Sequence, residues 1–248
     1  VDDSYKSTSI SFDTRLNMSN NDYFGLGING EFESAGSLNT SRDQVNILAS
    51  YNKSISSNTK GCHYIQAGLG LGIANRSLDT LDARWPSQHD GNGGFDPNLP
   101  GGLFDNTSYS YGDISIGLNW LSTFTNGMQL KIGAAIHHVN KPSISFLSND
   151  AQLAARSTFH GSFLFPVSSL LKLRPSFVHH TQGEHKETLY GFTSIWRFNQ
   201  NTNSALDLGF WVENNNGING PIANDYIVYG GYTYKHIKLG LAYDFENS

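Results

Sequence analysis

The segment Gln66-Ala67-Gly68-Leu69-Gly70-Leu71-Gly72-Ile73-Ala74 is the clearest indication of how this chain folds. Ala67, Leu69, Leu71 and Ile73 occupy every second position, and glycine fills most positions between them. Because successive side chains of a β-strand point to opposite faces, the stretch has one apolar face and one small or polar face. Repetition of this pattern along a chain, without helical periods between the repeats, is typical of a membrane β-barrel.

Eleven other segments show the same alternation, and each is long enough to cross a bilayer as a tilted strand. Charged residues within these segments, such as Lys131 and Asp207, alternate with the apolar residues and therefore lie on the opposite, lumenal face. The twelve predicted strands cover Tyr5–Leu16, Tyr23–Glu33, Gln44–Ile55, His63–Leu78, Gly112–Phe124, Met128–Val139, Ala154–Val167, Leu171–Gln182, Lys186–Phe198, Ser204–Asn214, Asp225–Tyr234 and Lys238–Glu246.

The composition agrees with this interpretation. Charged residues make up 15% of the 248 residues, against about 25% in an average soluble domain. No continuous apolar run approaches the roughly 18 residues of a spanning helix. The strands are also longer than those of a soluble β-sandwich, which most often have about 5–6 residues. A net charge of −5 without a basic run argues against a nucleic-acid partner, and the single cysteine excludes an intramolecular disulfide.

The connections between the predicted strands alternate between short and long. The long ones are Asp79–Tyr111, Asn140–Leu153 and Asn215–Asn224, and Gly183-Glu184-His185 is a short exception on the same side. Outer-membrane barrels have long loops outside and short turns in the periplasm, so the first strand runs inward and the last runs outward. Both termini of such a barrel normally lie in the periplasm, so we expect one domain truncated at both ends, with about 14 strands in the full protein.

The longest predicted loop has an unusual apolar content, and loops of this length are seldom passive connectors. It could cover the pore, bind a partner or pack on itself. The candidate partner-binding residues in this loop are Trp85, Phe95, Leu99, Leu103 and Phe104.

Three other motifs have ordinary structural explanations. Gly25–Gly30 matches a dinucleotide fingerprint by its letters but lies inside a predicted strand without a following helix. Asp90–Asp96 resembles a calcium loop but lacks a third oxygen ligand and the closing glutamate, so turn formation explains it better. His137-His138 and His179-His180 are adjacent strand residues that we expect on opposite faces, with hydrogen-bonding roles. We therefore predict no metal site and no cofactor.

Several segments together resemble the PorP/SprF family, in order along most of the chain. The resemblance is carried by Ala74–Asp79 with Leu81, Trp85, Gln88, Gly91 and Phe95, by Gly112–Trp120, by Ala135–Pro142 and by Leu239–Asp244. It implies an outer-membrane protein of the type IX secretion and gliding machinery of Bacteroidota. Members of the family anchor periplasmic secretion components or pair with a secreted adhesin at the cell surface, and the family provides no catalytic residues to transfer.

The sequence therefore predicts an all-β transmembrane antiparallel barrel that is not an enzyme. We expect it in the bacterial outer membrane, in contact with lipid and lipopolysaccharide, docking a secreted surface protein or type IX secretion components. The alternative is a diffusion channel or small-molecule transporter, whose selectivity Lys131, Arg174, Arg197 and Asp207 would set. An outer-membrane hydrolase is a third class, although no nucleophile elbow is present.

Overall fold

The computed structural model describes residues 6–36, 40–58, 61–78, 85–91, 94, 96, 98–99, 107–146, 151–199, 204–217, 220–235 and 237–245. These residues form twelve β-strands and two short 3-10 helices, η1 (Ser19–Asn21) and η2 (Pro86–Gln88). The strands are β1 (Lys6–Asn17), β2 (Tyr23–Ala35), β3 (Thr40–Asn58), β4 (Gly61–Ser77), β5 (Ser108–Phe124), β6 (Gln129–His137), β7 (Arg156–Pro166), β8 (Leu171–Gln182), β9 (His185–Asn199), β10 (Ser204–Gly217), β11 (Gly220–Tyr234) and β12 (Ile237–Phe245).

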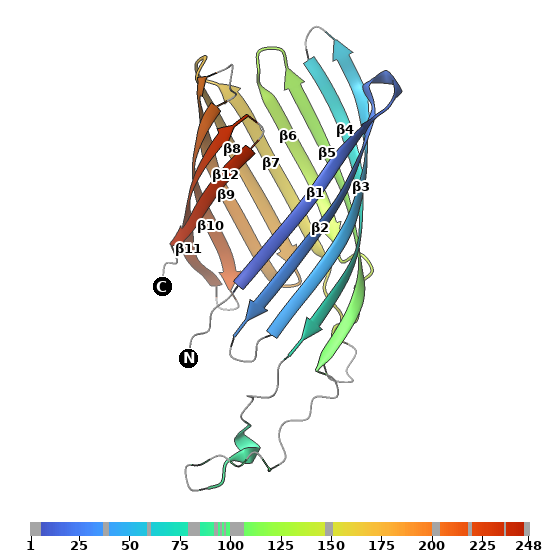
Figure 1. The fold of residues 1–248 in the computed structure, drawn as a ribbon, viewed down its shortest axis with the longest axis vertical. Coiled ribbons are helices and arrows are strands. Elements are labelled where there is room, and N and C mark those ends of the chain that lie inside the picture. Colours follow the sequence, from blue (N-terminus) through green and yellow to red (C-terminus); the bar gives the residue numbers. More distant parts are fainter. Residues whose placement is uncertain are drawn as a thin grey trace.

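All twelve strands belong to one antiparallel sheet in which sequence neighbours are also neighbours in space (Figure 1). Each predicted strand is confirmed, with ends that move by a few residues. The prediction that Asn215–Asn224 is a long loop is wrong. β10 and β11 continue through this interval and pair there, for instance Asn216 with Pro221. The run of asparagines led to the prediction of a loop, because asparagine is more common in turns than in strands.

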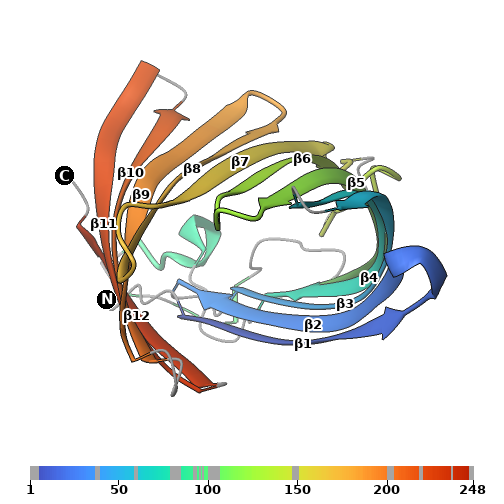
Figure 2. The same cartoon turned by 90° about the horizontal axis from the view of Figure 1, so that it is seen from above.

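The sheet curls around a central space, as the view along the strands shows (Figure 2). Among the described residues, β1 pairs only with β2 and β12 pairs only with β11, so the ring is not closed. β1 and β12 run antiparallel to each other because they are the first and last of an even number of alternating strands. The curl and the antiparallel order are those of a β-barrel wall.

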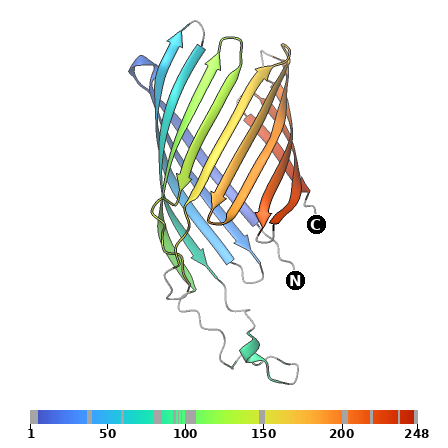
Figure 3. The ribbon, with the colours of Figure 1, turned by 180° about the vertical axis from the view of Figure 1, so that it is seen from behind.

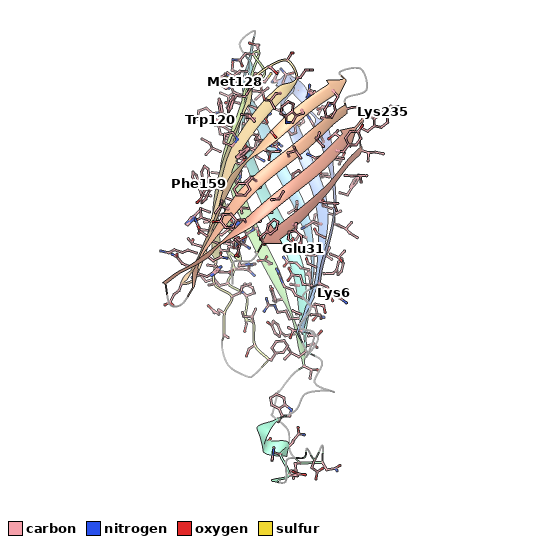
Figure 4. The ribbon with its side chains drawn as sticks, turned by 90° about the vertical axis from the view of Figure 1, so that its left-hand side faces the viewer. Lys6, Glu31, Trp120, Met128, Phe159 and Lys235 are labelled. Carbon is pink, nitrogen blue, oxygen red and sulfur yellow. The ribbon has the colours of Figure 1, made fainter. Side chains whose placement is uncertain are left out.

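The large apolar side chains lie on the outer surface of the sheet instead of in a core. Trp120 on β5 and Phe159 on β7 project outward (Figure 4), with exposed fractions of 58% and 47%. No large side chain of the described residues is completely buried. An apolar surface of this extent requires an apolar surrounding, which a lipid bilayer provides.

The outer face of β3 gives the height of the apolar surface. Val45, Ile47 and Tyr51 are exposed on this face. A charged residue stands at each end of this series, Asp43 at one and Lys53 at the other. Asp43 and Lys53 are ten residues apart, which is about 33 Å along a strand. At the tilt of about 40° found in membrane barrels, this corresponds to a band about 25 Å tall. The band matches the hydrocarbon layer that such barrels span.

The two ends of the sheet differ, and we name them for their connections. The loop end is where β4 ends and β5 begins, and η2 lies beyond the strands there (Figure 3). The turn end is the opposite one, where Met128 and Lys235 lie (Figure 4). Among the described residues, no helix is long and apolar enough to cross a bilayer.

Asp22 organises the turn end between η1 and β2. Its side chain is almost completely buried and pairs with the Lys53 ammonium at 2.8 Å. The Tyr51 hydroxyl and the backbone N–H of Ser54 also donate hydrogen bonds to it, at 2.7 and 2.8 Å. These contacts, led by that of Lys53, lower the pKa of Asp22 from 3.8 to about 2. The carboxylate therefore ties the β1–β2 turn to β3.

Candidate functional site

The inner face of the sheet borders a cavity of about 980 Å³. Glycines of β2 and β4 line it where the opposite face carries leucine or isoleucine, for instance Gly25 and Gly27 on either side of Leu26. The glycine-rich segment of β2 thus lies inside a strand, as predicted, and is part of the cavity wall; the next described element is β3, not a helix. Ionisable side chains from β1 to β7 also line the cavity: Asp13, Arg15, Glu31, Glu33, Arg42, Asp113, Lys131, His137, His138, Arg156 and His160.

A hydrogen-bonded network crosses the cavity wall near the loop end. Glu33 pairs with Arg42 at 3.4 Å, and Arg42 donates a hydrogen bond to Gln44. Gln44 in turn donates to the carboxylate of Asp113 at 3.4 Å, and His138 contacts the same carboxylate through Nδ1 at 2.9 Å. Gln44, Asp113 and His138 are all buried. The network fixes polar side chains of β2, β3 and β5 in one arrangement, because each buried group depends on its neighbour for a partner.

The first histidine pair corrects a prediction. We expected His137 and His138 on opposite faces, but both line the cavity, with ring centroids 6.4 Å apart. The reason is that β6 ends at His137, and His138 has a φ of 57°, which breaks the alternation of a strand. His137 contacts Ser115 through Nδ1 at 3.1 Å. The expected hydrogen-bonding role is therefore confirmed, although the expected placement is wrong.

The second pair, His179-His180, lies inside β8 and does point to opposite faces. His179 contacts Thr188 of β9 at 2.8 Å, and His180 contacts Thr158 of β7 at 2.9 Å. Among the described residues, no three His, Cys, Asp or Glu side chains are grouped as metal ligands would be.

Asn140 extends the sheet beyond the end of β6. Its Oδ1 accepts a hydrogen bond from the backbone N–H of Ile114 at 3.1 Å, and its Nδ2 donates to the carbonyl of Gly112 at 2.7 Å. The side-chain amide thus takes the place of a strand residue on the β5 edge. Further along the same segment, Phe146 packs edge-on against Tyr109, with ring centroids 4.7 Å apart. These contacts hold the segment after β6 against β5 at the loop end.

Gln88 holds the described part of the long loop together. Its Oε1 accepts from the backbone N–H of Trp85 at 3.2 Å, and its Nε2 donates to the carbonyl of Leu99 at 3.1 Å. Its backbone carbonyl accepts from the N–H of Asp96 at 2.9 Å. Gln88 is 8% exposed, which is unusual for a loop glutamine. Through it, two of the candidate partner-binding residues, Trp85 and Leu99, are fixed relative to each other.

The two aspartates of the calcium-like segment, Asp90 and Asp96, have the turn-forming contacts that we predicted. Asp90 accepts a hydrogen bond from the backbone N–H of Gly94 at 2.8 Å, and Asp96 accepts from that of Asn98 at 2.9 Å. Both carboxylates therefore stabilise the backbone of the loop, which is the usual role of aspartate in turns.

The structure describes two of the five candidate partner-binding residues. Trp85 is half-buried, and Leu99 is 36% exposed. Phe95, Leu103 and Phe104 lie outside the described residues. Gln88 and Asn140 were not among the predicted functional residues, because isolated amides in loops carry no periodic signal.

An antiparallel sheet that curls around a charged cavity, with its apolar side chains outside, defines a membrane protein of the β-barrel class. The chain belongs to the PorP/SprF family: the family described as type IX secretion system membrane protein PorP/SprF matches residues 1–248. Neither the curated proteins nor the solved structures give a significant match.

Proposed function

We propose that this protein is an outer-membrane component of type IX secretion that docks a secreted surface protein, and that it is not an enzyme. The observation that carries the proposal is the Gln88 clamp, which holds Trp85 and Leu99 beyond the strand ends. A loop fixed by buried hydrogen bonds costs less conformational entropy on binding than a mobile one. Exposed or half-buried apolar side chains on such a loop are suitable anchors for a protein partner.

The loop end corresponds to the outside of the cell in this proposal. Bacterial outer-membrane barrels have their longer loops outside, and the β4–β5 connection is the longest in this chain. The loop would therefore meet a partner that has already crossed the membrane. The turn end would face the periplasm, where it is available to other secretion components.

Replacement of the segment from Arg84 to Leu103 by a glycine–serine linker tests the docking role. We expect the secreted partner to be lost from the cell surface, measured by antibody labelling of intact cells. Barrel assembly, measured by heat-modifiable migration in gels, should be unchanged because no strand is altered.

A smaller variant, W85A/L99A, should also reduce retention of the partner. The matched control is V167A/L170A, which removes two similarly exposed apolar side chains at the turn end, where Val167 is 54% and Leu170 is 51% exposed. If both pairs reduce retention equally, or neither does, the loop is not the docking surface.

The alternative function is a diffusion channel, which the size and charge of the cavity favour. Conductance in planar bilayers separates the two functions. A stable open pore with ion selectivity supports the channel, whereas a closed barrel that is purified with a large protein bound supports docking.

A further inference from the structure

One part of the cavity wall is basic throughout. β6, β7 and β8 contain no aspartate or glutamate. Ile132, Phe159 and Phe177 are exposed on the outer face of these three strands, so the alternate residues point inward. Six of the inward side chains are here called the basic wall: Lys131, Arg156, Arg174, His137, His160 and His180. Lys172 of β8 is a further cation on the same face, nearer the turn end.

The three cations of the basic wall have no partner among the described residues. The side chains of Lys131, Arg156 and Arg174 make no hydrogen bond or ion pair there. Two other inward cations are paired: Arg42 with Glu33, and Lys238 with Asp207. Lys131 is exposed, and Arg156 and Arg174 are half-buried. Lys131 and Arg156 line the cavity, and the alternation of β8 places Arg174 on the same inner face of the sheet.

Carboxylates lie at the edges of the basic wall but do not neutralise it. On β9, Glu187 stands opposite His180 in the register, and on β5, Asp113 is bonded to His138. Across the cavity, the inward residues of β1 and β2 include three carboxylates, Asp13, Glu31 and Glu33, and one cation, Arg15. Figure 2 shows these two strands on the side opposite β6 to β8. The cavity is therefore polarised, with an acidic and a basic side.

The spacing of the cations selects a long ligand. Lys131 is level with Ser162 of β7, and Ser162 is level with Ser176 of β8. Arg156 lies six residues from Ser162 toward the loop end, which is about 20 Å along the strand. Arg174 lies two residues from Ser176 in the other direction, which adds about 7 Å. One small anion cannot contact all three cations, whereas an extended polypeptide of about eight residues can.

We infer that the basic wall binds an acidic, extended segment of the secreted partner inside the cavity. This inference rests on the proposed docking function and names the chemistry of the partner. Several weak contacts made by one chain add up to a useful affinity because the later contacts are intramolecular. The acidic side of the cavity would repel the carboxylates of the segment and so favour its position against β6–β8.

The test uses the purified protein in detergent and a fluorescent peptide of alternating glutamate and serine, about ten residues long to match the wall. We expect binding, measured by fluorescence anisotropy, that weakens as salt is added. The triple variant K131Q/R156Q/R174Q should bind about tenfold more weakly or worse. The matched control K6Q/K141Q/K186Q removes three exposed lysines elsewhere and should stay within about twofold.

Two results of the binding assay would overturn the inference. The first is equal affinity of the triple variant and the unmodified protein, with both folded by heat-modifiable migration. The second is displacement of the peptide by free glutamate at the same carboxylate concentration, because this would indicate a site for small anions.

Surface retention of the partner in cells separates the two proposals. Loss of retention in the triple variant supports the basic wall. If the triple variant retains the partner while the loop replacement does not, the wall is not a docking site and the docking function stands. If both variants retain the partner, the docking function itself fails, and the inference falls with it.

Discussion

The side-chain amide of Gln88 donates a hydrogen bond to the backbone carbonyl of Leu99, eleven positions further along the loop, at 3.1 Å. The same side chain accepts from the N–H of Trp85, so its donor and its acceptor tie two separate parts of the loop. A buried amide that satisfies backbone groups is costly to replace, because its removal leaves those groups without partners.

The Gln88 clamp gives the first prediction. Q88A should open the loop and raise its rate of cleavage by trypsin about thirtyfold, because two backbone groups lose partners that contribute about 1 kcal/mol each. The unfolding temperature of the sheet should not change, since no strand contact is lost. Q88E is the informative comparison: it keeps the acceptor for Trp85 and loses the donor to Leu99, so an intermediate cleavage rate is expected. Equal cleavage of all three proteins would contradict the clamp.

Asn140 gives the second prediction. N140A should leave the N–H of Ile114 and the carbonyl of Gly112 without partners and free the segment after β6 from the β5 edge. The free energy of local opening should fall by about 1 kcal/mol, since solvent partly replaces the lost bonds. Hydrogen exchange of the Ile114 amide measures this as an acceleration of about fivefold. The amide of Trp120, in the middle of β5, is the internal control, and a similar acceleration there would indicate general destabilisation instead.

The third prediction concerns pH at the turn end. The folded pKa of Asp22, about 2, lies below its ordinary value of 3.8, so the carboxylate stabilises the fold fully above pH 3.8. This stabilisation is lost as the pH falls through about 2. D22N should therefore unfold at a lower temperature than the unmodified protein at pH 6, and the difference should shrink as the pH falls from 3.8 to 2. Circular dichroism in detergent measures both proteins, and a difference that does not depend on pH would contradict the assignment to this charge.

The lipid-facing band gives the fourth prediction. Ile47 is 65% exposed near the middle of the band, so I47R would place a charge in hydrocarbon. Its cost should be about 2–4 kcal/mol of folding free energy in lipid vesicles. The control S11R places the same charge on the inner face of β1, two residues from Asp13, and should cost less than about 1 kcal/mol. Equal costs, measured by denaturant titration of tryptophan fluorescence, would show that the outer face does not meet lipid.

Most of the fold was predictable from local pattern. The alternation of apolar residues from Gln66 to Ala74 predicts β4, because a strand points successive side chains to opposite faces and each face can then meet a different environment. Charged residues such as Asp207 marked the inner face correctly, and Asp207 is 3% exposed there. The hairpin between β10 and β11 was missed because its residues favour turns locally, while pairing with the neighbouring strand overrides that preference.

The candidate site was less predictable. The apolar content of the long loop was visible in the sequence, but the role of Gln88 depends on backbone groups that are distant in the chain. The placement of His137 and His138 on one face depends on a single φ angle, which no side-chain pattern encodes. The basic wall is a third case, because its cations become neighbours only when the register of β6, β7 and β8 is fixed.

Local sequence is enough to specify long alternating strands with an apolar and a polar face, because the period of side-chain direction is a property of the backbone. The tertiary structure alone decided which polar residues share a wall, which buried amides clamp the loop, and where a strand ends at a histidine. Those features arise from contacts between segments far apart in the chain, and their free energy has no counterpart in the local pattern.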